Sequence, residues 1–157
     1  MNSHAGRLTA STMLVSAWLG AALLAIAVVA PGAFAVLPSR TLAGALVGRV
    51  LPTLFVAGLL LSVTVASLAG FKRPGAAASI TALLSGAACA VAQFGVAPRL
   101  ARLRVDIGGA VERLALDDPR RVAFGLLHGY SVAALGVAML AAALCLACLL
   151  VALRSRT

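Results

Sequence analysis

The chain has 157 residues, of which 62% are hydrophobic, with a mean hydropathy of +1.09 and a net charge of +9. A soluble domain has roughly 45 to 50% apolar residues, so this composition excludes an ordinary soluble fold. The basic residues stand at the ends of apolar stretches and are not interleaved with aromatic residues. This pattern favours contact with anionic lipid headgroups and argues against nucleic-acid binding.

Four stretches of the chain contain no Asp, Glu, Lys or Arg, namely residues 8–39, 50–71, 74–98 and 122–153. A helix needs about 20 apolar residues to cross the hydrocarbon core of a bilayer, which is about 30 Å thick. The sequence therefore predicts an all-α integral membrane protein, a four-helix bundle in a single transmembrane domain of residues 1–157. The expected crossings cover about residues 12–30, 42–69, 76–96 and 120–153.

The first crossing has an alternative interpretation. Arg7, the apolar run after it and Ala33-Phe34-Ala35 resemble a secretory signal with a small-residue cleavage site. However, an apolar core of about 20 residues exceeds the usual length of about 7 to 15 for such signals. This favours a first helix that stays in the membrane and ends at Pro31-Gly32.

The next connections are short and contain turn and cap residues. Ser39 or Thr41 can accept hydrogen bonds from the free amides at the start of the second helix. Residues 70–75, with Lys72 and Pro74, leave room only for a tight reversal. The second and third helices are therefore expected to be antiparallel neighbours.

Residues 99–121 form the longest connection. Pro98 is expected to end or kink the third helix, and apolar residues then recur at helical spacing with charged residues between them, at Leu100, Leu103, Ile107, Val111 and Leu114. This pattern predicts an amphipathic helix at the membrane surface between helices three and four, with a break at Gly108-Gly109 as an alternative. Asp117-Asp118-Pro119 predicts the start of the last helix, with Asp as the N-cap.

Small residues at four-residue spacing are expected to hold the helices together. Lipid chains are as apolar as leucine, so hydrophobicity does not drive association in a membrane, and close packing must do so. The stripes are Ala17, Ala21 and Ala25; Gly44 and Gly48; Gly58, Ser62, Ala66 and Gly70; Ala78, Ala82, Gly86 and Ala90; and Gly125, Gly129 and Ala133.

Polar residues inside the crossings lean toward one side of the membrane. Four crossings place both termini and residues 70–75 on one side, and residues 31–40 and 99–121 on the other. The second side has all four acidic residues and lies nearer to the polar residues of the crossings. Such residues are costly in a membrane and often functional, so we predict a polar layer of Arg49, Gln93, His128, Tyr130 and Ser131.

Within this layer, His128 is the most versatile residue. A histidine can ligate a metal or haem iron, carry protons or make a hydrogen bond between helices, and for a lone histidine the hydrogen bond is favoured. Arg49 has a simple alternative, since its long stem can bring the guanidinium among the headgroups. Cys145 and Cys148 could share a copper(I) ion, but no further ligand lies nearby in the sequence, which favours packing.

No motif in the sequence points to a reaction. The chain has no phosphate loop, nucleophile elbow or carboxylate pair, and no acidic residue lies inside a crossing. We therefore expect a non-enzymatic membrane module with no cofactor and no metal site, and with anionic lipid, a second copy or another membrane protein as partner. The alternative is a haem- or copper-handling protein that uses His128.

Several short motifs carry a family resemblance. They are Ala30-Pro31, Val36-Leu37-Pro38-Ser39-Arg40, Ala97-Pro98-Arg99, and Phe124 with Leu127-His128-Gly129-Tyr130-Ser131. In these residues the chain resembles the transmembrane-protein-205-like family and, more distantly, copper-resistance-D membrane domains. The resemblance implies a four-helix membrane domain of unknown function. The chain departs from it at Leu126 and Leu135, where that family tends to have arginine and asparagine.

Arginine and lysine counts bear on localisation. The side with residues 31–40 and 99–121 has eight basic residues if Arg49 is included, and the other side has five. The positive-inside rule then places both termini outside. Twelve arginines against one lysine, with much alanine and glycine, suggest a GC-rich bacterial genome and hence the cytoplasmic (inner) membrane of a bacterium.

Overall fold

The computed structural model describes residues 2–72, 74–108 and 111–155, and the described residues contain helices and no strands. The all-α prediction is confirmed. The elements in chain order are α1 (Asn2–Leu24), η1 (Ala25–Val29), α2 (Ala30–Val36), α3 (Arg40–Ala69), α4 (Ala76–Ala90), η2 (Val91–Val96), α5 (Ala97–Ile107), η3 (Val111–Arg113) and α6 (Pro119–Arg154).

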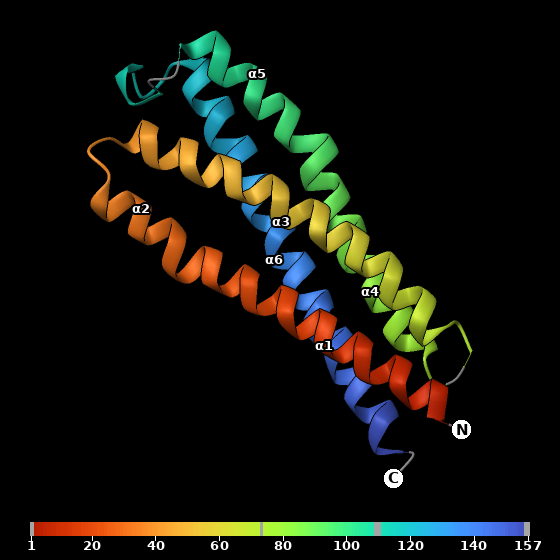
Figure 1. The fold of residues 1–157 in the computed structure, drawn as a ribbon. Coiled ribbons are helices and arrows are strands. Elements are labelled where there is room, and N and C mark those ends of the chain that lie inside the picture. The colour runs from red at the N-terminus through yellow and green to blue at the C-terminus, as the bar shows by residue number, and fades with distance from the viewer. Residues whose placement is uncertain (1, 73, 109–110, 156–157) are drawn as a thin grey trace.

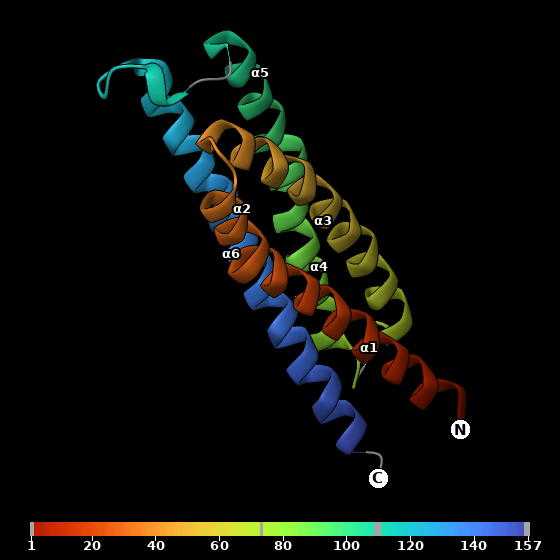
Figure 2. The same cartoon turned by 60° about the vertical axis from the view of Figure 1, so that its left-hand side comes forward.

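These elements combine into four long rods, each long and apolar enough to cross a membrane. They cover Ala5–Val36, Arg40–Ala69, Ala76–Ile107 and Pro119–Arg154. Both ends of the chain lie at the same end of the bundle as the turn between α3 and α4, and α2, α5 and the start of α6 lie at the other end (Figures 1 and 2). The chain is thus a multi-pass membrane protein with the predicted connectivity.

The first and third rods each pass through a proline without ending. A proline inside an α-helix removes one hydrogen bond and clashes with the carbonyl four residues back. Here a π-helical turn precedes each proline, η1 before Pro31 and η2 before Pro98. The wider π turn shifts the hydrogen bonds to five-residue spacing and accommodates the ring.

The structure therefore does not show a separate interfacial helix. Because η2 accommodates Pro98, α5 continues the third rod, and the described residues after it form only the short η3 turn before α6. The apolar residues Leu100, Leu103, Ile107, Val111 and Leu114 are all partly buried. Gly108 ends α5 with a left-handed φ of 74°, whereas Gly109 lies outside the described residues.

Two helix starts match their predicted caps. Ser39 precedes α3, and its hydroxyl accepts a hydrogen bond from the Leu42 amide at 3.2 Å. Asp118 precedes Pro119 and accepts from the Arg120 amide at 2.8 Å. Each cap satisfies an amide that has no partner inside its helix.

Small residues form the contact between α3 and α4, and α4 packs about as extensively against α6 as against α3. Gly58, Ser62, Ala66 and Ala69 are buried on α3, and Ala78, Ala82, Gly86 and Cys89 are buried on α4. The predicted stripes on these two helices are confirmed at Gly58, Ser62, Ala66, Ala78, Ala82 and Gly86, whereas Gly44, Gly48, Gly70 and Ala90 are partly buried. On the other two rods Ala25 is buried as predicted, but the stripes are otherwise wrong, because Ala17, Ala21, Gly125, Gly129 and Ala133 are exposed. The buried face of α1 is formed instead by Leu8, Ser11, Val15, Trp18 and Ala22.

Side chains also tie neighbouring rods together by hydrogen bonds to backbone carbonyls. The Trp18 indole donates to the Leu54 carbonyl at 3.0 Å, and the Ser85 hydroxyl donates to the Ala138 carbonyl at 2.8 Å. The Cys145 thiol points at the Ala78 carbonyl at 3.3 Å. In this environment Cys145 acts as a packing residue with a weak donor.

We expect Trp18→Phe to lower the free energy of unfolding by about 1 kcal/mol. The change removes the indole donor from a buried contact, and hydrogen bonds in membrane proteins are worth roughly 0.6 kcal/mol on average and up to about 1.7. Unfolding in mixed detergent micelles measures the loss. Tyr130→Phe is the control, because Tyr130 is 61% exposed and its hydroxyl makes no hydrogen bond to a described residue. Equal stability of both variants would contradict the role given to the indole.

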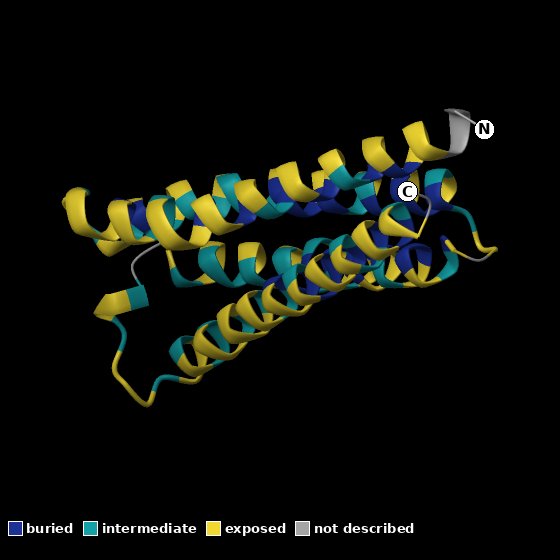
Figure 3. Cartoon of the chain, turned by 90° about the horizontal axis from the view of Figure 1, so that it is seen from below, coloured by how far each residue is buried: buried dark blue, intermediate teal, exposed yellow. Residues whose placement is uncertain are grey.

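The core is confined to one end of the bundle. Most buried residues lie in the half that contains the chain termini, and none of the described side chains of α5 is buried (Figure 3). The rods therefore separate at the end formed by α2, α5 and the start of α6. The polar residues of the chain gather at this open end.

Candidate functional site

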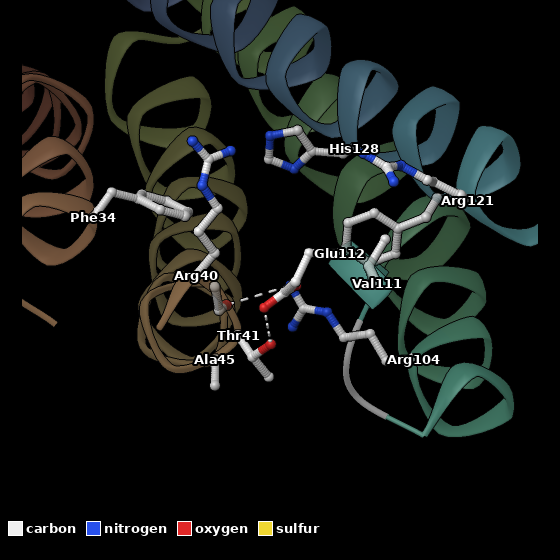
Figure 4. A pocket seen from close by; sticks show the side chains of 11 residues that line it. Phe34, Arg40, Thr41, Ala45, Arg104, Val111, Glu112, Arg121 and His128 are labelled. Carbon is white, nitrogen blue, oxygen red and sulfur yellow. Dashed lines mark hydrogen bonds between the residues drawn. The ribbon is translucent and has the colours of Figure 1, made fainter. Parts of the chain in front are cut away.

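A polar cavity of about 410 Å³ lies in the open end of the bundle, where α3, α5 and α6 diverge (Figure 4). Its walls come from four parts of the chain: α2, α3, the residues from α5 to η3, and α6. The lining residues are Phe34, Arg40, Thr41, Gly44, Ala45, Arg104, Val111, Glu112, Arg121, Phe124 and His128. We call this space the polar cavity.

The side chain of Arg104 extends from α5 and contacts residues of α3 and α6. Its Nη2 donates to the Gly44 carbonyl at 3.3 Å, and its guanidinium carbon lies 5.5 Å from the centre of the Phe124 ring. The second contact is a cation–π interaction, which holds the plane of the guanidinium. A Cβ at Gly48 would lie 2.6 Å from Nη1 of Arg104, so only glycine at this position leaves room for the side chain.

Arg121 and Arg40 add two further guanidinium groups. Arg121 is partly buried and donates from Nη1 to the Leu114 carbonyl at 2.7 Å, which fixes the connection before α6. Arg40 is exposed at the start of α3. Among the lining residues, three guanidinium groups thus face a single carboxylate, that of Glu112.

The carboxylate of Glu112 is held by the opposite wall. Thr41 on α3 donates its hydroxyl to Oε1 of Glu112 at 2.8 Å. The backbone amide of Glu112, the Thr41 hydroxyl and the nearby Arg113 and Arg40 lower the pKa of this carboxyl below its ordinary value. The bond joins η3 to α3 across the mouth of the polar cavity.

We expect Thr41→Val to raise the pKa of Glu112 toward its ordinary value, because the valine cannot donate a hydrogen bond. A lowered pKa means that the contact stabilises the fold above the pKa of the unfolded chain and that this stabilisation is lost as pH falls through the folded pKa. The variant should lose less stability on acidification than the wild type. Carboxyl carbon NMR on the protein in micelles measures the pKa, and an unchanged value would contradict the contact.

An apolar groove of about 250 Å³ adjoins the polar cavity and shares Phe34 and His128 with it. It runs between the first rod, α3 and α6. Its remaining lining is Ala25, Ile26, Val29, Ala30, Val47, Val50, Leu51, Ser131, Val132 and Leu135. We call this space the apolar groove. The π-helical segment η1 supplies part of one wall.

A third cavity of about 330 Å³ lies between α3, the η2–α5 junction and α6. Arg104 lines it together with the polar cavity, and Ser131 lines it together with the apolar groove. Gln93 of η2 also lines it, and the Oε1 atom of Gln93 is buried with no hydrogen-bond partner among the described residues. A buried amide oxygen without a partner is costly, so a water or ligand donor fits this position.

The structure brings together only part of the predicted polar layer. Gln93, His128 and Ser131 line the connected cavities. Arg49 and Tyr130 are exposed and line none of these three spaces. His128 is exposed toward the polar cavity and the groove, and its side chain makes no hydrogen bond to a described residue. The expected interhelical hydrogen bond of His128 is thus not shown.

The residues that dominate the polar cavity are not among the predicted site residues. The sequence pattern indicated Arg104 and Glu112 as charged residues of an interfacial helix, Thr41 as a cap, and Arg40 and Arg121 as charges at the ends of apolar stretches. The sequence feature that could have indicated this cavity is the pair of glycines Gly44 and Gly48, which lies in an arginine-rich part of the chain. Their partner, Arg104, comes from another rod, and no local pattern predicts that pairing.

The first three rods identify the family. Residues 13–108 match the domain of unknown function DUF4149. The chain belongs to this family. The match includes both π-helical turns, Gly48 and Arg104, whereas α6 with His128 and Arg121 lies outside it. No curated protein and no solved structure matches the chain at a significant level.

In this DUF4149 protein, no group of three or more His, Cys, Asp or Glu side chains among the described residues is placed to hold a metal ion. Cys145 is buried against α4, and Cys148 is partly buried one turn further along α6. His128 lies near arginines in the polar cavity and near apolar side chains in the apolar groove. The arrangement at the open end is suited to an anion.

Proposed function

We propose that this DUF4149 protein is a non-enzymatic module of the cytoplasmic membrane that binds an anionic group in its polar cavity. The observation that supports the proposal is the convergence of Arg40, Arg104 and Arg121 from three helices on one space that contains a single carboxylate. The planar fork of a guanidinium matches the oxygens of a phosphate or a carboxylate. Glu112 keeps its negative charge while it accepts from Thr41, so it balances only one of the three positive charges.

The arginines of the lining are suited to binding and not to proton transfer. An arginine side chain stays protonated in proteins and cannot act as a general base. The one carboxylate of the cavity accepts the hydrogen bond of the Thr41 hydroxyl, and this bond joins two walls of the cavity. This favours a module that holds its ligand without changing it.

We also propose which side of the membrane the polar cavity faces and how far the family resemblance extends. Eight basic residues at the open end favour placing the polar cavity on the cytoplasmic side. The partly buried apolar face of α5 would then lie at the level of the headgroups. The resemblance to the transmembrane-protein-205-like family and to copper-resistance-D domains extends to the four-helix membrane fold, and fold alone transfers no activity.

Thermal unfolding in a nonionic detergent tests anion binding. We expect inorganic phosphate, exchanged for chloride at constant ionic strength, to raise the unfolding temperature of the wild type, because a ligand that binds only the folded state stabilises it. Arg104→Gln should lose this shift. Arg102→Gln is the matched control, since Arg102 is exposed on the same helix and does not line the cavity. Loss of the shift in both variants, or no shift in the wild type, would refute the proposal.

A further inference from the structure

The apolar groove adjoins the polar cavity. Phe34 from α2 and His128 from α6 line both spaces and mark the point where they meet. On one side of this point the walls carry arginines, and on the other side they carry valine, isoleucine, leucine and alanine side chains. A ligand that fills both spaces must have a charged head joined to an apolar tail.

We propose that the occupant is an anionic membrane lipid, with its phosphate in the polar cavity and one acyl chain in the apolar groove. This inference rests on the anion-binding function proposed above and names the class of ligand. Charge complementarity favours the anionic head, since three guanidinium groups face one carboxylate. The apolar lining of the groove favours a hydrocarbon chain.

The depth of the two spaces in the membrane agrees with this orientation. About 20 helical residues span the hydrocarbon core, so a crossing that starts at Ala69 ends near Val50, and one that starts at Leu153 ends near Ala134. The lining residues of the polar cavity on α3 and α6 lie beyond these positions, at the level of the headgroups. The groove begins nearer the headgroups at Val47, Ser131 and Val132 and reaches the hydrocarbon core at Leu51 and Leu135.

A groove between helices must be filled when the protein is in a bilayer. The side chains around an empty apolar space lose dispersion contacts, and a water molecule there has too few hydrogen-bond partners. The π-helical turn η1 widens the first rod at Ala25, Ile26 and Val29, which all line this groove. π-helical turns of this kind are frequent at functional sites. A lipid chain is the filler that the membrane supplies.

Native mass spectrometry of the purified full-length chain tests the lipid. The protein in nonionic detergent receives equal amounts of phosphatidylglycerol and phosphatidylcholine, which share acyl chains and differ in net charge. We expect the wild type to retain one phosphatidylglycerol in preference to phosphatidylcholine, and Arg104→Gln to lose this preference. If the wild type retains both lipids equally, the bound molecules are annular lipids that surround the protein without a specific site, and the inference is overturned.

Two valines of α6 provide a matched pair for the acyl chain. Val132 lines the groove and Val137 does not, yet their side chains are 56% and 55% exposed. Val132→Trp should fill the mouth of the groove and weaken retention of phosphatidylglycerol by about tenfold, equal to about 1.4 kcal/mol. Val137→Trp should bind like the wild type. Because both positions are exposed, both variants should fold, and the unfolding temperature checks this.

The outcomes separate the two proposals. If Val132→Trp retains phosphatidylglycerol like the wild type while phosphate still stabilises the protein through Arg104, anion binding stands and the acyl chain is not in the groove. If glycerol phosphate displaces the bound lipid as effectively as phosphatidylglycerol at equal concentration, the ligand is a soluble anion and the lipid inference fails. If phosphate has no effect and Arg104→Gln binds like the wild type, both proposals fail.

Discussion

Gly86→Ala is expected to destabilise the bundle by about 1 to 3 kcal/mol, the usual cost of forcing an extra group into a packed core. A Cβ at this position on α4 would overlap the side chain of Ser62 on α3. Ser62 is buried, and its hydroxyl is already bound to the Leu59 carbonyl at 2.7 Å, so it has little room to move. The free energy of unfolding in mixed micelles measures the loss.

Gly136→Ala on α6 provides the control, because no described atom outside its own helix lies within 4 Å of a Cβ built there. Alanine is a better helix former than glycine by about 1 kcal/mol, so this variant should be as stable as the wild type or slightly more stable. A Gly86→Ala protein as stable as Gly136→Ala would show that α3 and α4 are not packed through this stripe.

Gly48→Ala is expected to have the largest effect on the polar cavity with little effect on stability. A Cβ at Gly48 would lie 2.6 Å from Nη1 of Arg104, and this atom is the far end of a flexible side chain that can swing away. The guanidinium would then leave its place between Gly44 and Phe124. Losing one charge-assisted hydrogen bond, worth about 1.5 to 3 kcal/mol, weakens phosphate binding about 10- to 100-fold.

Gly44→Ala is the matched control one turn earlier on the same helix. A Cβ there would lie 3.7 Å from Nη2 of Arg104, which is an ordinary van der Waals contact. Phosphate should stabilise this variant as it stabilises the wild type. Equal phosphate binding by the two alanine variants would contradict the placement of Arg104.

Much of the fold could be predicted from the sequence because its determinants are local. A run of about 20 residues without charge predicts a crossing whatever its neighbours are. The caps at Ser39 and Asp118 depend on residues two or three positions away. The small-residue stripes of α3 and α4 were also predicted, because they follow from the four-residue spacing. The short turn between these helices predicted that they are antiparallel neighbours.

The same local rules could not predict that the third rod continues through Pro98 in place of the expected interfacial helix. Pro98 normally ends or kinks a helix, and the apolar spacing after it fits a surface helix. The π-helical turn η2, which lets the third rod continue, involves one extra residue in a turn and leaves no clear pattern in the sequence. Tertiary structure thus decided between two interpretations of residues 99–107.

The candidate site depended on contacts between distant parts of the chain. Arg104 reaches the Gly44 carbonyl across 60 positions of the sequence, and Thr41 reaches Glu112 across 71. Gln93, His128 and Ser131 could be predicted as polar residues inside the crossings. The arginines of the polar cavity could not, because arginines near helix ends are expected to lie among headgroups. Only the divergence of the rods shows that these arginines share a cavity.

A crystal structure of the full chain grown in a lipid phase that contains phosphatidylglycerol tests the central claim most directly. The account predicts phosphate density within hydrogen-bonding distance of Arg104 and Arg121, continuous with an acyl chain that passes His128 and lies along Ile26 and Leu135. A polar cavity that contains only water, or an open end that closes so that α5 packs against α3 without space between them, would contradict it.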